Sequence, residues 1–216
     1  MRRLLPNVVY ALLYASGVYG LVLWPPIRMA VTAIADPLRR ALAPGVDSTP
    51  MLIRCVLAFI LADAFAYWMH RAAHANRILW RFHRTHHDGP ELGVLTTFRF
   101  NVVEIAWRMA LQFLPLHLLG IAAAIPTGVV LSLLAFNLLA HSNRDWHFGV
   151  VGHAFVSPAY HGAHHRYERA NYGMYLVVWD SLFGTRSSHE ERHDRHDQRD
   201  DAYAEGGQRE ELGLRV

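Results

Sequence analysis

The chain has 216 residues, of which 52% are hydrophobic and only 18% are charged. Soluble domains carry about a quarter charged residues, so this composition indicates a protein that is solvated partly by lipid. The formal net charge is only +3 and Cys55 is the single cysteine, so we expect no nucleic-acid partner, no disulfide framework and no cysteine-ligated metal.

Four apolar stretches are predicted, in chain order, to cross a bilayer, which takes about 20 residues each. The first, Leu4–Trp24, lacks a cleavage site and is expected to be a retained helix rather than a signal peptide. The second is Met51–Met69. The third and fourth share the segment Val102–Ala140, which allows two short helices joined by a turn at Leu116–Gly120 or at Pro126–Gly128.

The segment Ile27–Ala43 lies between prolines and predicts an amphipathic helix on the membrane surface. An even number of crossings places both termini and the polar stretches 70–101 and 141–186 on one side, and the arginines of these stretches favour the cytoplasm. In a bacterium the membrane would be the inner one. The three arginines of 27–43 fall on the opposite side and count against this orientation.

The sequence therefore predicts an all-α, multi-pass membrane helical bundle of about four transmembrane helices with a cytoplasmic, histidine-rich helical cap. Residues 1–186 are expected to form this domain. Residues 187–216 are rich in charge and poor in apolar side chains, so we expect a disordered tail.

Histidine is the most over-represented residue, with 15 copies. Three groups have spacings that place imidazoles on one helix face: His70 and His74; His83, His86 and His87; and His161, His164 and His165. Imidazole suits iron, zinc, copper and nickel. These eight histidines exceed the needs of one ion, so two metals are expected.

The fourth apolar stretch adds two further candidates. His141 follows it directly and is a candidate ninth ligand, while Asn137, one turn earlier, is expected to hold a bound water. Since the first histidine group and His141 each begin where an apolar stretch ends, the site should sit at the membrane boundary. The alternative is surface histidines clustered by chance, which the repeated H-x-x-H-H spacing disfavours.

Around these histidines the chain resembles the fatty acid hydroxylase and sterol desaturase superfamily. The resemblance covers roughly residues 60–186 and is carried by 63–74 (DAFAYWMHRAAH), 79–87 (LWRFHRTHH), 158–165 (PAYHGAHH), 171–173 (NYG) and 179–185 (WDSLFGT). It implies an integral membrane oxygenase with the metal ligands His70, His74, His83, His86, His87, His141, His161, His164 and His165.

The family often has Arg-Phe-His-Pro-x-Glu where this chain has RFNVVE at 99–104. Asn101 thus replaces a histidine, and the contacts on the substrate side need not match those of the family.

The resemblance further implies two iron ions, which zinc can replace in purified protein, and O₂ as co-substrate. Its substrate would be a membrane lipid, whether fatty acyl, sterol-like or carotenoid, that is hydroxylated or desaturated. Two electrons would come from a ferredoxin- or cytochrome-type donor with its reductase. Two other hypotheses stay open: a membrane zinc hydrolase that uses the same histidines, and a metal transporter or sensor.

Other polar residues complete the set. Asp63, in the second apolar stretch, is expected to fix the tautomer of a metal-binding imidazole; the alternative is a structural pair with Arg54 or a tyrosine. Glu104 and Arg108 have the i, i+4 spacing of a neutralising pair. No ligand role is expected for His117, His147 or His153, and the H-E-x-x-H match at 189–193 is expected to be fortuitous.

Overall fold

The computed structural model describes residues 5–88, 92–122 and 127–187. The described residues are helical apart from loops and one isolated bridge, between Phe155 and Leu176. In chain order the elements are α1 (Leu5–Ala15), α2 (Val18–Asp47), α3 (Met51–Ala75), α4 (Arg77–His87), the 3-10 helix η1 (Val94–Phe98), α5 (Val102–Leu118), α6 (Thr127–Ala140), the 3-10 helix η2 (Gly149–His153), α7 (Pro158–Tyr167) and α8 (Val178–Leu182). The all-α prediction is therefore confirmed.

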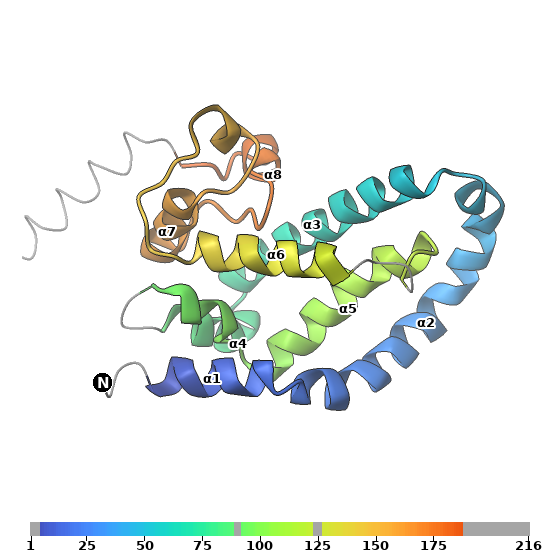
Figure 1. Cartoon of the computed structure of the whole chain (residues 1–216), viewed down its shortest axis with the longest axis horizontal. Helices are drawn as coiled ribbons and strands as arrows, with labels where there is room; N and C mark the ends of the chain where they lie inside the picture. The colour runs from blue at the N-terminus through green and yellow to red at the C-terminus, as the bar shows by residue number, and fades with distance from the viewer. Residues whose placement is uncertain (1–4, 89–91, 123–126, 188–216) are drawn as a thin grey trace, which may run out of the picture.

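The first predicted span is wrong in its limits. The helix expected over Leu4–Trp24 breaks at Gly17, whose φ of +74° is one that glycine adopts at little cost. The following helix, α2, then runs for 30 residues and includes the whole segment predicted to be a separate surface helix. Its four internal prolines bend α2 without ending it, as its curved path shows (Figure 1).

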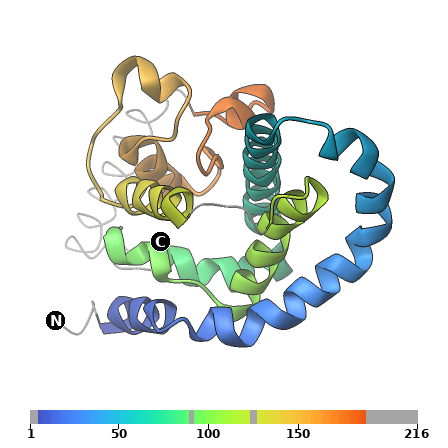
Figure 2. The same ribbon diagram turned by 45° about the vertical axis from the view of Figure 1, so that its right-hand side comes forward.

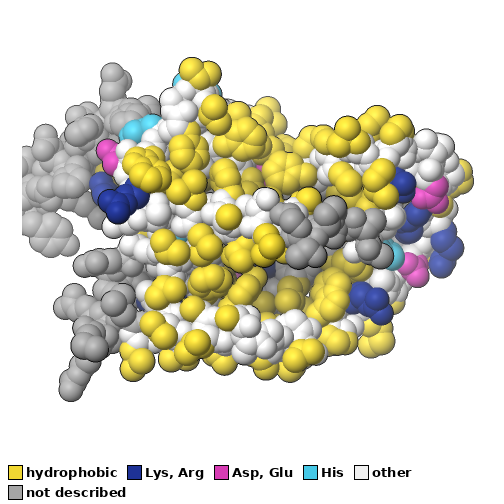
Figure 3. Space-filling view, in the orientation of Figure 1, with side chains coloured by type: hydrophobic (Ala, Val, Ile, Leu, Met, Phe, Trp, Pro, Cys, Tyr) yellow, Lys and Arg dark blue, Asp and Glu magenta, His cyan; other side chains and the backbone are white. Residues whose placement is uncertain are grey.

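Two helices among the described residues, α2 and α3, are long and apolar enough to cross a bilayer. Neither is a buried core helix, because Leu21 and Ile34 on α2 and Leu52 on α3 are 77%, 81% and 75% exposed. Hydrophobic side chains accordingly cover much of the visible surface, while charged ones gather at the end where α2 turns into α3 (Figure 3). An apolar surface of this extent fits a membrane environment.

The segment 102–140 forms two short helices, as expected, but α5 has 17 residues and α6 has 14, so neither reaches the usual length of a span. The first predicted turn coincides with the end of α5, where Gly120 has φ +66°. The second, Pro126–Gly128, coincides with the start of α6, and the residues between, 123–126, lie outside the described part.

The helices form two regions. Helix α5 lies between α2 and α3 and packs against both, whereas α4, α6, α7 and α8 gather around the carboxyl end of α3 (Figures 1 and 2). The charged tail lies outside the described residues from 188 onward. Ser187 itself is buried and bonded to Asn171, so the folded part includes it.

Candidate metal centre

The first two histidine groups come from helices that meet at a sharp turn. His70 and His74 lie one turn apart in the last part of α3, which ends at Ala75. Asn76 then caps α4, accepting hydrogen bonds from the backbone N–H of Ile78 and Leu79 at 2.8 and 3.2 Å. This abrupt restart turns the chain so that the α4 histidines face those of α3.

The third group lies on α7, which also has a well-defined start. Ser157 accepts a hydrogen bond from the backbone N–H of Tyr160, and Pro158 occupies the first turn, where its missing N–H costs nothing. His161, His164 and His165 then line the face of α7 that meets α4 and the end of α6, from which His141 is contributed.

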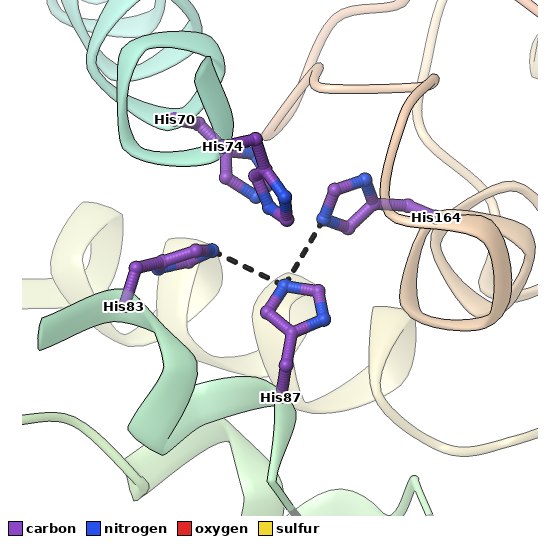
Figure 4. Close-up of side chains that lie close together, drawn as sticks. All are labelled: His70, His74, His83, His87 and His164. Atoms are coloured by element: carbon purple, nitrogen blue, oxygen red, sulfur yellow. Dashed lines mark hydrogen bonds between the residues drawn. The ribbon is translucent and has the colours of Figure 1, made fainter. Parts of the chain in front are cut away.

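The nine predicted histidines come together as two adjacent groups. Group one comprises His70, His74, His83, His87 and His164, and group two comprises His86, His141, His161 and His165. Within each group, one ring nitrogen from every member lies within 4.8 Å of the others. Figure 4 shows the five rings of group one pointing toward a common centre from α3, α4 and α7.

Within each group, Nε2 atoms of different rings lie close to one another. In group one, Nε2 of His87 lies 3.2 Å from Nε2 of His83 and 3.3 Å from Nε2 of His164. In group two, Nε2 of His141 lies 2.9 Å from Nε2 of His161 and 3.2 Å from Nε2 of His86. Such convergence of lone-pair atoms is what a cation would require.

Four of the rings have their tautomer set by an oxygen on the outer side. Each of these rings donates a 2.8 Å hydrogen bond from Nδ1. His70 donates to the Tyr172 carbonyl and His83 to the Glu104 carboxylate. His141 donates to the Asn137 carbonyl and His164 to the Ala170 carbonyl. A neutral imidazole with its proton on Nδ1 presents a bare Nε2 lone pair inward. This arrangement is typical of metal-binding histidines.

The rings outside the apolar helices are held neutral. Burial lowers the pKa of His141 to about 4 and that of His164 to about 3. Burial, followed by the other histidines, also lowers the pKa of His86, His87 and His165. Neutral imidazoles are the form that binds metals, so the donor set fits two ions of the class that imidazole prefers.

Glu104 has a role that the sequence reasoning did not assign. The expected pair with Arg108 exists at 3.7 Å, but the same carboxylate oxygen lies 2.8 Å from Nδ1 of His83, and Glu104 is only 2% exposed. The i, i+4 spacing to Arg108 favoured the simpler interpretation. The RFNVVE stretch was the available signal, since it retains the glutamate of the family pattern.

Asp63 makes no hydrogen bond to an imidazole, so the prediction that its carboxylate fixes the tautomer of a metal-binding histidine is wrong. Its carboxylate accepts hydrogen bonds from the backbone N–H of Tyr175 and Leu176 and from Nε1 of Trp179, at 3.0, 3.2 and 2.8 Å. The alternative partner Arg54 lies instead 3.7 Å from Asp47. Asp63 therefore ties the 175–179 segment to α3.

Asp180 is a second buried carboxylate that the sequence reasoning passed over, although it lies within the WDSLFGT stretch. It accepts from the backbone N–H of Tyr172 and Gly173 at 2.8 and 2.6 Å and from the hydroxyls of Tyr160 and Thr185. These contacts fix the loop whose Tyr172 carbonyl orients His70. Asp180 thus supports group one through the backbone.

Asn137 is placed beside the centre, though the contacts found differ from the expected bound water. Its carbonyl orients His141, and its side chain hydrogen-bonds to Tyr175. Asn101, where the family often has histidine, caps α5 by accepting from the backbone N–H of Val103.

The remaining histidines of the described part lie outside both groups. His117 pairs with Asp36 at 2.8 Å, His147 with Asp145 at 2.9 Å, and His153 contacts the Val150 carbonyl. The H-E-x-x-H match at 189–193 lies outside the described residues.

Comparison with known proteins places this centre in a defined family. A family model described as fatty acid hydroxylase matches residues 55–185. Ornithine lipid hydroxylase OlsE of Rhizobium tropici is 34% identical over 185 residues, which cover 83% of this chain and 56% of that protein. Human alkylglycerol monooxygenase is 32% identical over 143 residues, 62% of this chain and 31% of that protein. Human lathosterol oxidase is 29% identical over 139 residues, 62% of this chain and 45% of that protein.

The chain spans about half the length, or less, of these relatives. No solved structure matches it significantly.

Proposed function

The chain belongs to the fatty acid hydroxylase family, and on that premise we propose that it is an integral membrane oxygenase that uses two iron ions and O₂ to hydroxylate or desaturate a membrane lipid. Hydroxylation of an acyl chain in a polar membrane lipid is the favoured form. One relative, matched over 83% of this chain, is by name a hydroxylase of ornithine lipid.

The observation that carries this proposal is the sharing of helices between the two histidine groups. Helix α4 contributes His83 and His87 to group one and His86 to group two. The two groups are so close that the ring centroids of His87 and His165 are 4.5 Å apart. Two metals held by these rings would therefore be close neighbours.

Two neighbouring irons, when bound, supply the chemistry that lets O₂ attack an unactivated C–H bond. In hydroxylation one oxygen atom enters the lipid and the other leaves as water, with two electrons and two protons taken up. The protein's part is to hold the metals through neutral, oriented imidazoles and to fix those rings from outside through Glu104 and the carbonyls of Tyr172, Asn137 and Ala170.

The electrons must come from a separate donor in this proposal. The outer face of α4 carries Arg77, Arg81 and Arg84, all exposed and spaced along one side of the helix. This basic face lies on the helix that supplies His83, His86 and His87, so it suits the docking of an acidic ferredoxin- or cytochrome-type carrier.

A multi-pass arrangement with the histidine centre on the cytoplasmic side is part of the same proposal. Helices α2 and α3 form a hairpin whose turn lies at the opposite end of the molecule from α4 and α7 (Figure 1). In a Cys55→Ser background, which removes the exposed native thiol, membrane-impermeant labelling of cysteines introduced singly at Arg84 and Ser48 in intact cells should then modify position 48 and spare position 84. The reverse pattern would overturn the orientation.

The hydrolase and transporter hypotheses fit the geometry less well. A catalytic zinc uses three protein ligands and one open position, whereas nine imidazoles converge here. Transport sites usually lie near the bilayer midplane, whereas both groups lie around the carboxyl end of α3.

The deciding experiment uses isotopically labelled O₂. Iron-loaded protein in lipid nanodiscs, supplied with a ferredoxin and its reductase, should place label from O₂ into a lipid hydroxyl group. Desaturation would instead remove two hydrogens without incorporating label. Lipid products with oxygen only from water, or a protein that retains at most one metal after careful reconstitution, would reject the proposal.

A further inference from the structure

The chain between His141 and the start of α7 carries outward-facing apolar side chains, and it is irregular apart from the short 3-10 helix η2. Trp146, Val150, Val151 and Phe155 are 54%, 87%, 57% and 40% exposed. A soluble surface rarely gathers such residues in a loop without a partner. The loop matters for the centre because His141 before it and His161 in α7 both belong to group two.

This loop is joined to the segment that leads into α8 and includes it. The backbone N–H of Val156 donates to the Tyr175 carbonyl at 2.9 Å, and that of Val177 donates to the Ala154 carbonyl at 3.0 Å. The second segment is also apolar on its outside, since Val178 and Leu182 are 47% and 67% exposed. The two segments, 146–156 and 175–183, therefore form one unit, which we call the apolar flap.

The apolar flap is fastened to the side of α3 rather than to its end. Asp63, in the candidate membrane span, accepts hydrogen bonds from the backbone of Tyr175 and Leu176, and the rings of Tyr175 and Phe59 lie 5.9 Å apart. On the neighbouring helix α6, Phe136 contacts Phe155 with ring centroids 6.5 Å apart. The flap thus lies beside the apolar stretches of two helices.

The attachment of the flap to α3 can be related to an interface residue. Trp68 is 46% exposed and is of the type that marks a membrane interface. Asp63 precedes it by five positions, which is about 7 Å along a helix. Elements that lie in the interface are buried by about 5–10 Å, so with Trp68 as the marker the attachment point lies within that layer, on the side of the histidine centre.

The backbone of the flap also suits this layer. Within the turn around η2, the N–H groups of Val151, Ala154 and Phe155 donate to carbonyls inside the same loop. Internal pairing of this kind lowers the cost of leaving water. At the base of the loop, Asp145 is 90% exposed and pairs with His147, and Arg144 is exposed, so charges border the apolar tip as they would at lipid headgroups.

We propose that the apolar flap inserts into the lipid headgroup layer beside α3 and α6, with Val150 and Val151 as its deepest residues. The occupant of this surface is lipid because the exposed apolar side chains continue onto α3 and α6, both of which are apolar helices. Insertion would anchor the chain between His141 and His161 and so hold group two at the level where membrane lipids are found. The inference rests on membrane embedding and not on the reaction catalysed.

Fluorescence quenching in nanodiscs tests this proposal. Cys55 is the single cysteine, so a Cys55→Ser background allows one environment-sensitive label at Val150→Cys. The matched control carries the label at Arg84→Cys, on the exposed face of α4. We expect spin-labelled lipids to quench the label at position 150 and aqueous iodide to leave it unaffected, with the opposite pattern at position 84.

Two outcomes would overturn the proposal. Iodide quenching at position 150 equal to that at position 84 would place the loop in water. Shielding from both quenchers would indicate a protein partner, such as a second copy of the chain. Metal content and thermal unfolding equal to those of the Cys55→Ser parent show that the label has not disturbed the fold, and Val151→Cys provides a second site if position 150 does not tolerate it.

Discussion

The two histidine groups share α4 and α7, yet they are supported differently. In group one, His70, His83 and His164 each donate an Nδ1 hydrogen bond to an oxygen outside the group, whereas in group two only His141 does so. Nδ1 of His86 and of His161 in group two is buried without a hydrogen-bond partner, as is Nδ1 of His87 in group one. Group two also has four imidazoles where group one has five.

The difference suggests a division of labour. Oriented rings bind a metal at a lower entropic cost, so group one should hold its ion more tightly. Group two has fewer ligands and less constrained rings, which leaves room for an exogenous molecule beside its metal. We therefore expect group one to act as the structural half of the centre and group two as the more adaptable half.

The largest expected effect is the removal of a ligand from either group. His161→Ala should abolish lipid turnover and lower the metal content from about two ions per chain to one, because group one keeps all five of its rings. His164→Ala should also abolish turnover but lose more than one ion, since α3, α4 and α7 meet through group one. Elemental analysis of purified protein and lipid mass spectrometry measure both. Equal losses in the two variants would remove the proposed asymmetry.

The next effect concerns the carboxylate behind His83. Glu104→Gln keeps the shape but removes the charge that holds the Nδ1 proton and balances Arg108, 3.7 Å away. Loss of such an outer partner typically costs about 10- to 100-fold in metal affinity or activity. Competition with a chelator measures the affinity.

Glu168→Gln is the matched control for this change. Its carboxylate lies 3.7 Å from Nδ1 of His87 but is 45% exposed, so solvent screens it and the change should be nearly silent. Wild-type affinity in Glu104→Gln, or equal losses in both variants, would contradict the role of Glu104.

The spacing of the histidines predicted eight of the nine that come together, because i, i+3 and i+4 positions share a helix face. The ninth, His141, was predicted from its place at the end of an apolar stretch and from the family resemblance. The partition into two groups was not predictable. It depends on how α4 faces α3 and α7, so that His86 and His87, adjacent in sequence, serve different groups. The oxygens that accept the Nδ1 hydrogen bonds of the rings were not predictable either. Backbone carbonyls carry no sequence signal, and the contact between Glu104 and His83 joins positions 21 residues apart.

The helix limits failed where local rules compete. Prolines 25 and 26 were expected to end a helix, but the packing of α2 along α5 keeps it continuous through them. The glycine at position 17, inside an apolar stretch, set the actual break.

A smaller effect on the metals is expected from Asp63, which supports the fold and contacts no histidine. Asp63→Asn can still accept at one oxygen but cannot accept at both, so at least one buried donor among Leu176, Tyr175 and Trp179 loses its partner. An unsatisfied buried donor costs about 1–3 kcal/mol. Thermal unfolding should therefore shift to lower temperature, while metal affinity changes less than in Glu104→Gln. A loss of metal as great as that in Glu104→Gln would show that Asp63 acts on group one more directly.

The smallest expected effect comes from a substitution that acts on group two alone. His86 has no oxygen on its Nδ1, and its ring instead stacks on Phe100 with centroids 4.7 Å apart and an interplanar angle of 8°. Arg108 also lies over the Phe100 ring, with its guanidinium carbon 4.6 Å from the ring centroid. Phe100→Leu keeps an apolar contact but removes the flat surface that orients the imidazole.

We expect chelator-driven metal release from the wild type to show two phases, with the faster one arising from group two. Phe100→Leu should accelerate the fast phase by a few-fold, since stacking contributes on the order of 1 kcal/mol, and should leave the slow phase unchanged. Glu104→Gln should do the reverse, because its carboxylate serves only His83 of group one. If Phe100→Leu accelerated the slow phase, or if the wild type released both ions in a single phase, the two groups would behave as one unit and the difference in their supports would have no effect on metal release.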